Sequence, residues 1–411
     1  MSAGFKRKDI EATKLENKIM TDYFGELKEA IDTKNRKIAW CTSVGPAELL
    51  RGLGFLVYFP ENHGAMLGAT RMSTDLIDSS VEIGFSPNAC SYLKSDIGSY
   101  LNNQTPLKEA YGFSSVPKPD VLVYNTSQCK DVQYWFKWYG KEFGVPVLGM
   151  HTPREIENGD MELNYMGTNQ IKSMIAPLEK IIGKKLDMDR LKEVIANSLK
   201  TSQIWNKCLE LNSNVPAPWT FFDSCIHMGP AVVLRGDKVA IDYYETLYKE
   251  LNEKVRNTEA AVEGEKHRLF WAGIPVWGKI GALSKQLGSL KANVVASTYC
   301  SSWVFNDLDP ENPLDSLGKV YTELYISGND DRRAKYLKKC FDFYKIDGIL
   351  YHNAWTCDYS SETKFGLHKT ICEKTGIPYI VIDGDLNDLR CYSEEQTKTK
   401  IEALIEELEG I

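Results

Sequence analysis

Ten cysteines are the most reactive groups in this 411-residue sequence, and three of them lie in loops. Cys129 follows the apolar run VLVYNTSQ and Cys357 follows ILYHNAWT, so each comes just past the carboxyl end of a predicted strand. Cys90 lies between the turn SPNA and the segment SYLKSDIGSYL, which predicts a helix that begins at this thiol. A helix N-terminus lowers a thiol pKa, so this position favours a thiolate ligand.

Three thiolates from separate loops suit either a metal ion or an iron–sulfur cubane with one open position. The chain contains no C-x₂-C pair, which argues against the compact zinc-ribbon and ferredoxin patterns. Spacing alone leaves a second interpretation open, in which Cys90, Cys129 and Cys357 are three unrelated buried thiols.

The other cysteines divide by their surroundings, and Cys225 has no clear assignment. Three lie within predicted helices and are interpreted as packed thiols, namely Cys208, Cys340 and Cys372. Three follow strands or lie in loops beside the expected cleft, so extra ligation or a second cubane stays open for Cys41, Cys300 and Cys391.

The elements that must position these loops alternate between strands and helices in both halves of the chain, which predicts parallel sheets wrapped by helices. An amphipathic helix is expected over 5–33. The expected strands lie within 37–41, 55–59, 120–127, 145–153, 268–278, 293–300, 347–357 and 378–385. In such sheets the ligand binds outside the carboxyl ends of the strands, where the strand order reverses.

We therefore predict an α/β fold with two doubly wound parallel-sheet domains that face each other across a cleft. The N-terminal domain is expected over 1–165 with Cys90 and Cys129, and the C-terminal domain over 261–411 with Cys357. Long charged helices between them predict a helical connecting segment over 166–260.

Charge and hydropathy narrow the class of protein. The chain has 49 Lys and Arg against 56 Asp and Glu without basic runs, so no nucleic-acid partner is expected. No apolar stretch approaches the roughly 20 residues that cross a bilayer, and the stretch MSAGFKRKDIEATKLENK has no apolar signal core. We expect a cytoplasmic protein, without a membrane partner, whose cysteines stay reduced.

Seven distinctive stretches follow one another along the chain, namely WCTSVGPAELL, VYFPEN, NACSYLKSDIG, SQCKDVQYWFKWYGKEFGVPVL, RLFWAGIPVW, DGILYHNAWTC and GIPYIVIDGDLND. With these stretches the sequence resembles the family of 2-hydroxyacyl-CoA dehydratases and benzoyl-CoA reductases, from about residue 37 to 405. The resemblance implies a 4Fe–4S cluster held by Cys90, Cys129 and Cys357, with a non-cysteine ligand at the fourth iron. It also implies that Ser43 and Glu61 act at the substrate, as in the larger dehydratase subunit.

Both assignments have simpler alternatives. Ser43 follows the first strand, where its hydroxyl is able to reach a thioester carbonyl or only the loop backbone. Glu61 shuttles a proton if burial raises its pKa, and is otherwise a surface residue. His63 and His352 are interpreted as packing residues rather than as a proton relay or a cluster partner. Two acidic residues of the last strand loop stay unassigned, namely Asp383 and Asp385.

The resemblance further implies a lyase that removes water from a 2-hydroxyacyl-CoA thioester through a ketyl radical, in an oxygen-sensitive, anaerobic system. The chain has no GxxxxGKS/T phosphate loop. A separate ATP-hydrolysing iron–sulfur activator is therefore expected, together with a related second iron–sulfur subunit that completes a heterodimer. Three alternatives stay open: an ATP-dependent aryl-CoA reductase, a double-cubane cluster protein and a non-catalytic electron carrier.

Overall fold

Two four-stranded parallel sheets organise residues 9–157 and 159–411, the part of the chain that this computed structural model describes. The first sheet has the order β2-β1-β3-β4 and the second has the order β6-β5-β7-β8. The strands are β1 (Ile38–Cys41), β2 (Leu56–Tyr58), β3 (Val121–Asn125), β4 (Val147–Met150), β5 (His267–Ala272), β6 (Ala292–Ser297), β7 (Gly348–Ala354) and β8 (Tyr379–Gly384). Both sheets repeat one topology, which confirms the predicted α/β class with two parallel sheets.

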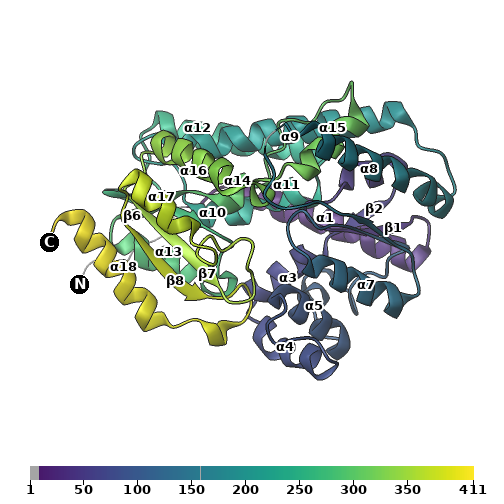
Figure 1. The fold of residues 1–411 in the computed structure, drawn as a ribbon, viewed down its shortest axis with the longest axis horizontal. Helices are drawn as coiled ribbons and strands as arrows, with labels where there is room; N and C mark the ends of the chain where they lie inside the picture. The colour runs from purple at the N-terminus through teal and green to yellow at the C-terminus, as the bar shows by residue number, and fades with distance from the viewer. Residues whose placement is uncertain (1–8, 158) are drawn as a thin grey trace.

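The strands are largely apolar because helices cover both faces of each sheet. Every residue of β1, β3 and β5 is buried. Trp40 of β1 and Trp271 of β5 occupy equivalent central positions and are fully buried. Figure 1 shows the first sheet on the right of the molecule and the second on the left.

Helices connect the parallel strands of the first sheet. They are α2 (Ala47–Leu53), α3 (Pro60–Ala69), α4 (Ser73–Glu82), α5 (Ser91–Asn102), α6 (Pro106–Tyr111) and α7 (Asp131–Phe143). Pro60 at the first position of α3 and Thr105, which caps α6, explain where these two helices begin. Helices α3, α4 and α5 form a group below the first sheet in Figure 1.

Long helices follow the first sheet, as the charged pattern predicts. They are α8 (Met161–Ile182), α9 (Met188–Glu210), α10 (Phe221–His227), α11 (Gly229–Val233) and α12 (Lys238–Arg256). Asp160, Asp187 and Asp237 cap α8, α9 and α12 through their side chains. In Figure 1, α9 and α12 extend along the upper edge from one sheet to the other.

The N-terminal helix α1 (Ala12–Thr33) packs against α12. The Glu250 carboxylate of α12 accepts hydrogen bonds from the backbone N–H groups of Glu11 and Ala12, at 2.8 and 2.9 Å. This helix was expected over 5–33, and positions 5–8 lie outside the described residues. In the described part of the chain, no helix combines the length and the apolar character that crossing a membrane requires.

The second sheet is surrounded by α13 (Ile280–Ser289), α14 (Thr298–Ser301), α15 (Pro313–Thr322), α16 (Asp330–Tyr344), α17 (Leu367–Thr375) and α18 (Glu394–Glu409). Helix α15 leaves this sheet and packs along α8. Two glycines permit the close approach, because a Cβ on Gly167 would lie 2.7 Å from the Gly318 carbonyl oxygen. Helix α15 thus fastens the second half of the chain to the first, and the boundaries at 165 and 260 stay a prediction.

Candidate active site

Ser43 and Cys129 follow two adjacent strands of the first sheet, β1 and β3. The chain leaves β1 towards β2 on one side and reaches β3 on the other, so this is the point where the strand order reverses. A crevice opens outside the carboxyl ends at such a point. Cys357 follows β7, which holds the corresponding position in the second sheet. The strands therefore place these loops at the expected edges.

Two backbone hydrogen bonds fasten the three cysteine loops together. Cys90 is the N-cap residue of α5, and its N–H donates to Asp131 Oδ2 at 2.8 Å, two residues after Cys129. The next N–H, that of Ser91, donates to Thr356 Oγ1 at 2.9 Å, one residue before Cys357. N–H groups at the start of a helix have no partner inside the helix. These two therefore bind the loops that carry Cys129 and Cys357.

The three thiols lie close enough to act on one another electrostatically. Burial raises the pKa of Cys90, against the lowering expected at a helix N-terminus, and negative charge on Cys129 and Cys357 raises it further. Burial also raises the pKa of Cys129 to about 12 and that of Cys357 in the same direction. Three neighbouring thiols of this kind become thiolates only when a bound cation or cluster compensates their charge.

The donor set here consists of three half-buried thiols on three separate loops. In a 4Fe–4S cubane each thiolate binds a different iron, so three thiolates leave one iron to another ligand. The residues present are therefore of the kind and number that such a cluster would use.

Arg154 places a positive charge beside these thiols. Its guanidinium lies 3.7 Å from the centre of the Tyr359 ring and donates hydrogen bonds to the carbonyl oxygens of Ile326, at 2.9 Å, and Gln128. Burial lowers the pKa of Arg154, and the charges of Cys129 and Cys357 oppose that shift. The side chain therefore offsets negative charge at the candidate cluster position.

A cavity of about 350 Å³ opens beside these loops and receives residues from both halves of the chain. We name it the catalytic cavity. Ser43 and Glu61 line it from the first sheet, and Tyr359 and Ser360 line it from the loop that follows Cys357. Apolar side chains such as Met20, Val44, Val232 and Trp303 form much of the remaining wall.

Glu61 is held in place by two donors inside this cavity. Its carboxylate accepts hydrogen bonds from the backbone N–H of Ser43 and from the side-chain amide of Gln128. Burial raises the pKa of Glu61, although both hydrogen bonds oppose that shift. A carboxyl group of this kind exchanges a proton closer to neutral pH than an exposed glutamate does. Gln128 was not expected to act here, although it directly precedes Cys129.

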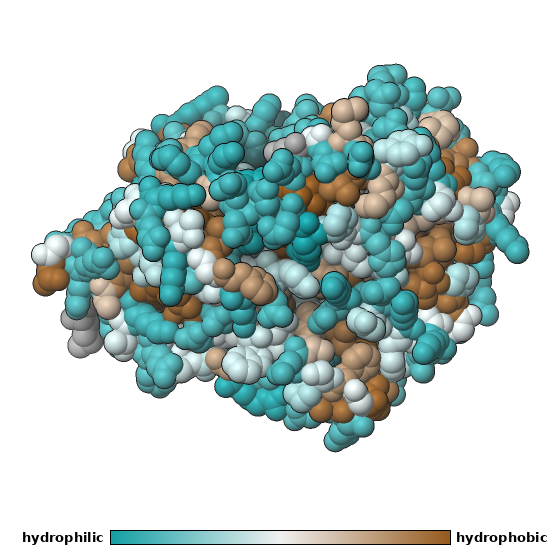
Figure 2. Space-filling model, in the orientation of Figure 1, coloured by the Kyte–Doolittle hydropathy of each residue, from teal (hydrophilic) through white to brown (hydrophobic). Residues whose placement is uncertain are grey.

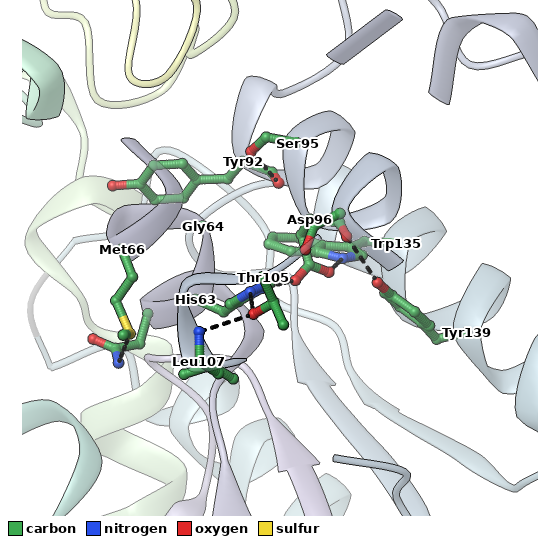
Figure 3. A network of polar contacts seen from close by, with 12 residues as sticks. His63, Gly64, Met66, Tyr92, Ser95, Asp96, Thr105, Leu107, Trp135 and Tyr139 are labelled. Carbon is green, nitrogen blue, oxygen red and sulfur yellow. Dashed lines mark hydrogen bonds and ion pairs between the residues drawn. The ribbon is translucent and has the colours of Figure 1, made fainter. Parts of the chain in front are cut away.

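His63 belongs to a buried network behind the cavity rather than to its wall (Figure 3). Its Nδ1 lies 2.5 Å from Asp96 Oδ1, and its Nε2 lies 2.9 Å from Thr105 Oγ1. Trp135 Nε1 donates to the second oxygen of Asp96 at 2.9 Å. Both ring nitrogens are occupied, so His63 fastens α3 to α5, as the packing interpretation proposed.

The second histidine and the acidic pair also contact neighbouring loops. His352 Nδ1 lies 2.5 Å from the Ile274 carbonyl oxygen, and burial lowers its pKa. Asp385 accepts hydrogen bonds from the backbone and side chain of Thr356, at 3.1 and 2.8 Å, and so orients the loop of Cys357. Asp383 accepts from Asn353 and Lys400, both at 2.9 Å.

Arg235 is a supporting residue of the first loop that sequence reasoning missed. Its buried guanidinium donates to the Gly45 carbonyl oxygen at 2.8 Å and lies 3.3 Å from Glu48 Oε1. Gly45 belongs to the loop of Ser43, so the Arg235–Glu48 ion pair and its hydrogen bond hold this loop in place. No local signal marks Arg235, because it comes from the helical segment.

The remaining cysteines have other neighbours. Cys41 is fully buried, and burial raises its pKa. The Cys300 and Cys225 sulfur atoms lie 3.9 Å apart. Cys391 is half-buried in the short helix Leu389–Cys391. The three cysteines interpreted as packed thiols lie in α9, α16 and α17, namely Cys208, Cys340 and Cys372.

Comparison with known proteins gives the family of this chain. A family model described as 2-hydroxyglutaryl-CoA dehydratase, D-component, matches residues 42–408, which include every loop described above. The chain belongs to this dehydratase family.

The similar proteins include dehydratase subunits and a benzoyl-CoA reductase subunit. The (R)-2-hydroxyisocaproyl-CoA dehydratase alpha subunit of Clostridioides difficile is 28% identical over 403 residues, which cover 97% of this chain and 96% of the relative. The lactoyl-CoA dehydratase subunit alpha of Anaerotignum propionicum is 27% identical and covers 91% of each chain. A benzoyl-CoA reductase subunit of Thauera aromatica is 28% identical over 87% of this chain and 85% of the relative.

Proposed function

We propose that this chain is the iron–sulfur catalytic subunit of a 2-hydroxyacyl-CoA dehydratase, a lyase that removes water from a 2-hydroxyacyl-CoA thioester. The observation that carries the proposal is the catalytic cavity, where Ser43 and a buried Glu61 lie beside three mutually interacting thiols. Membership of the dehydratase family and the names of its relatives support the choice of reaction.

Cys90, Cys129 and Cys357 would hold a 4Fe–4S cluster, as their shared electrostatics and separate loops allow. When bound, such a cluster supplies a Lewis-acidic iron and one electron for the thioester carbonyl, which yields a ketyl radical in the substrate. The electron has a very low potential, so the proposal includes an ATP-hydrolysing iron–sulfur activator and a related second subunit.

The protein's own side chains bind, orient and move protons. Ser43 lines the cavity and in this proposal donates its hydroxyl to the thioester carbonyl oxygen. The substrate radical expels its 2-hydroxyl group as hydroxide, and Glu61 accepts the proton from C3, because burial raises its pKa and Gln128 holds its carboxylate in one orientation. The proton and the hydroxide together make the water that leaves, and the product gives the electron back, so the overall reaction is redox-neutral. The apolar wall of the cavity excludes water from a reactive substrate.

Iron analysis of single variants tests this assignment. We expect about four irons and four sulfides per chain after anaerobic purification, and a 2-hydroxyacyl-CoA should alter one iron site in Mössbauer spectra. Replacing Cys90, Cys129 or Cys357 by Ser should remove most of the iron. Cys340→Ser, a half-buried thiol on α16, is the matched control and should retain it. Wild-type protein without iron, or equal iron in all variants, would refute the proposal.

An ATP-dependent aryl-CoA reductase is the second candidate. The benzoyl-CoA reductase relative is as similar as the first dehydratase relative, at 28% identity. Mössbauer spectra that change with benzoyl-CoA alone would favour this reaction. No spectral change with either thioester would favour an electron carrier. About eight irons per chain would favour a double cubane, although Cys300 has Cys225 as its sulfur neighbour.

A further inference from the structure

A second hollow, of about 650 Å³, adjoins the catalytic cavity. The two share Ser302, Leu324 and Tyr325 in their walls. The second hollow then extends to the N-terminal half of α16, so we name it the α16 hollow. The face shown in Figure 2 includes the region of α16 and is mainly hydrophilic. The α16 hollow and the catalytic cavity are therefore neighbours that share one wall.

Three cations of α16 line this hollow without an ion pair to any described residue. Lys335 and Lys339 lie four residues apart on one helix face, and neither forms an ion pair within the described residues. Arg332 donates one guanidinium nitrogen to the Glu323 carbonyl oxygen. Its Nη1 is buried and has no hydrogen-bond partner in the described part of the chain. A buried guanidinium donor without a partner indicates a missing acceptor.

The acidic residues of the same wall are largely occupied elsewhere. Asp307 pairs with Lys319 at 3.0 Å, and Asp331 approaches Lys374 at 3.9 Å. Glu323 Oε1 accepts hydrogen bonds from the Gly159 N–H at 2.8 Å and from Asn164 at 2.7 Å. Glu323 keeps its charge because these donors are neutral, and the exposed Glu157 is the other acid of this wall without an ion pair among the described residues. Three cations thus face two unpaired acids, which leaves a small excess of positive charge in the hollow.

Given the proposed function, on which this inference rests, we propose that the α16 hollow binds the phosphate-bearing nucleotide of the CoA thioester. Arginine and lysine are the side chains that bind phosphate oxygens. With the phosphates at Arg332, Lys335 and Lys339, the pantetheine arm passes Ser302 and Tyr325 and brings the thioester to the catalytic cavity. The hollow thus recognises the phosphate groups of the CoA nucleotide and not the acyl group.

Binding of a thioester with and without its nucleotide tests the inference. Acetyl-CoA and S-acetylpantetheine carry the same thioester, but only the first has phosphates. Calorimetry on the anaerobic, unactivated protein should show that K335A/K339A weakens acetyl-CoA binding by about tenfold or more. Binding of S-acetylpantetheine should not change. Lys338→Ala is the matched control, because Lys338 lies on the same helix, pairs with Asp342 at 3.4 Å and lies outside the hollow.

Salt provides a second readout. The acetyl-CoA affinity of the wild type should fall with ionic strength, and that of K335A/K339A should fall less. Unchanged acetyl-CoA binding in K335A/K339A would overturn the nucleotide site and leave the proposed function standing. If the same variant instead loses a co-purifying subunit, the hollow is a protein interface and the inference is wrong. A wild type that binds neither compound would overturn the proposed function as well.

Discussion

The buried carboxyl group of Glu16 should make this protein less stable as pH rises from acidic to mildly basic values. Glu16 lies on α1 at the wall of the catalytic cavity and exposes 7% of its surface. Its Oε2 has no hydrogen-bond partner among the described residues, and His227 Nδ1 lies 3.8 Å away. Burial raises the pKa of Glu16 from 4.5 to about 8.

The sign follows from proton binding in the two states. The folded protein keeps the proton up to about pH 8, whereas the unfolded chain releases it near pH 4.5. The stabilisation is therefore complete below pH 4.5 and is lost as pH rises through 8. One pKa unit corresponds to about 1.36 kcal/mol, so the shift from 4.5 to about 8 sets an upper limit of roughly 5 kcal/mol. Gln in place of Glu16 has no proton to release, so Glu16→Gln should remove this loss.

Anaerobic urea unfolding at several pH values, followed by tryptophan fluorescence, measures the effect. Between pH 5 and pH 8, the free energy of unfolding of the wild type should fall by at least about 1 kcal/mol more than that of Glu16→Gln. Glu29→Gln replaces an exposed carboxylate on the same helix and should follow the wild-type curve. Parallel curves for Glu16→Gln and wild type would show that this carboxyl group is ionised in the folded protein, against our reasoning.

Three further predictions concern the site. Thr356→Val removes the acceptor for the Ser91 N–H, so iron should be lost to a chelator several times faster than from the wild type; an equal rate would contradict its positioning role. Glu61→Gln should lower turnover by about 10²–10⁴-fold with little change in thioester affinity, and retention of full activity would exclude it as the acid–base group. Arg235→Met leaves the buried Glu48 carboxylate without its ion-pair partner, so urea unfolding should show a loss of about 3–5 kcal/mol, whereas a loss below about 1 kcal/mol would show that this pair contributes little to stability.

The sequence determined the elements and the loops that carry chemistry. Strand β3 and the helix after Cys90 are encoded locally, because apolar runs, turn residues and helical periodicity act over a few neighbouring positions. The alternation of strands and helices also predicted a parallel sheet in each half, which the structure confirms. The resemblance then selected Cys90, Cys129 and Cys357 from ten cysteines, a choice that spacing alone left open.

Tertiary structure alone decided how these loops meet. Ser91 and Thr356 are 265 positions apart, and Arg235 and Gly45 are 190 apart, yet each pair forms a hydrogen bond. No local sequence pattern predicts contacts at such separations, because they form only when elements that are distant in the chain pack together. The same packing brings Glu16 of α1 to the catalytic cavity and joins that cavity to the α16 hollow. Local chemistry thus fixes which groups exist, and long-range packing fixes which of them act together.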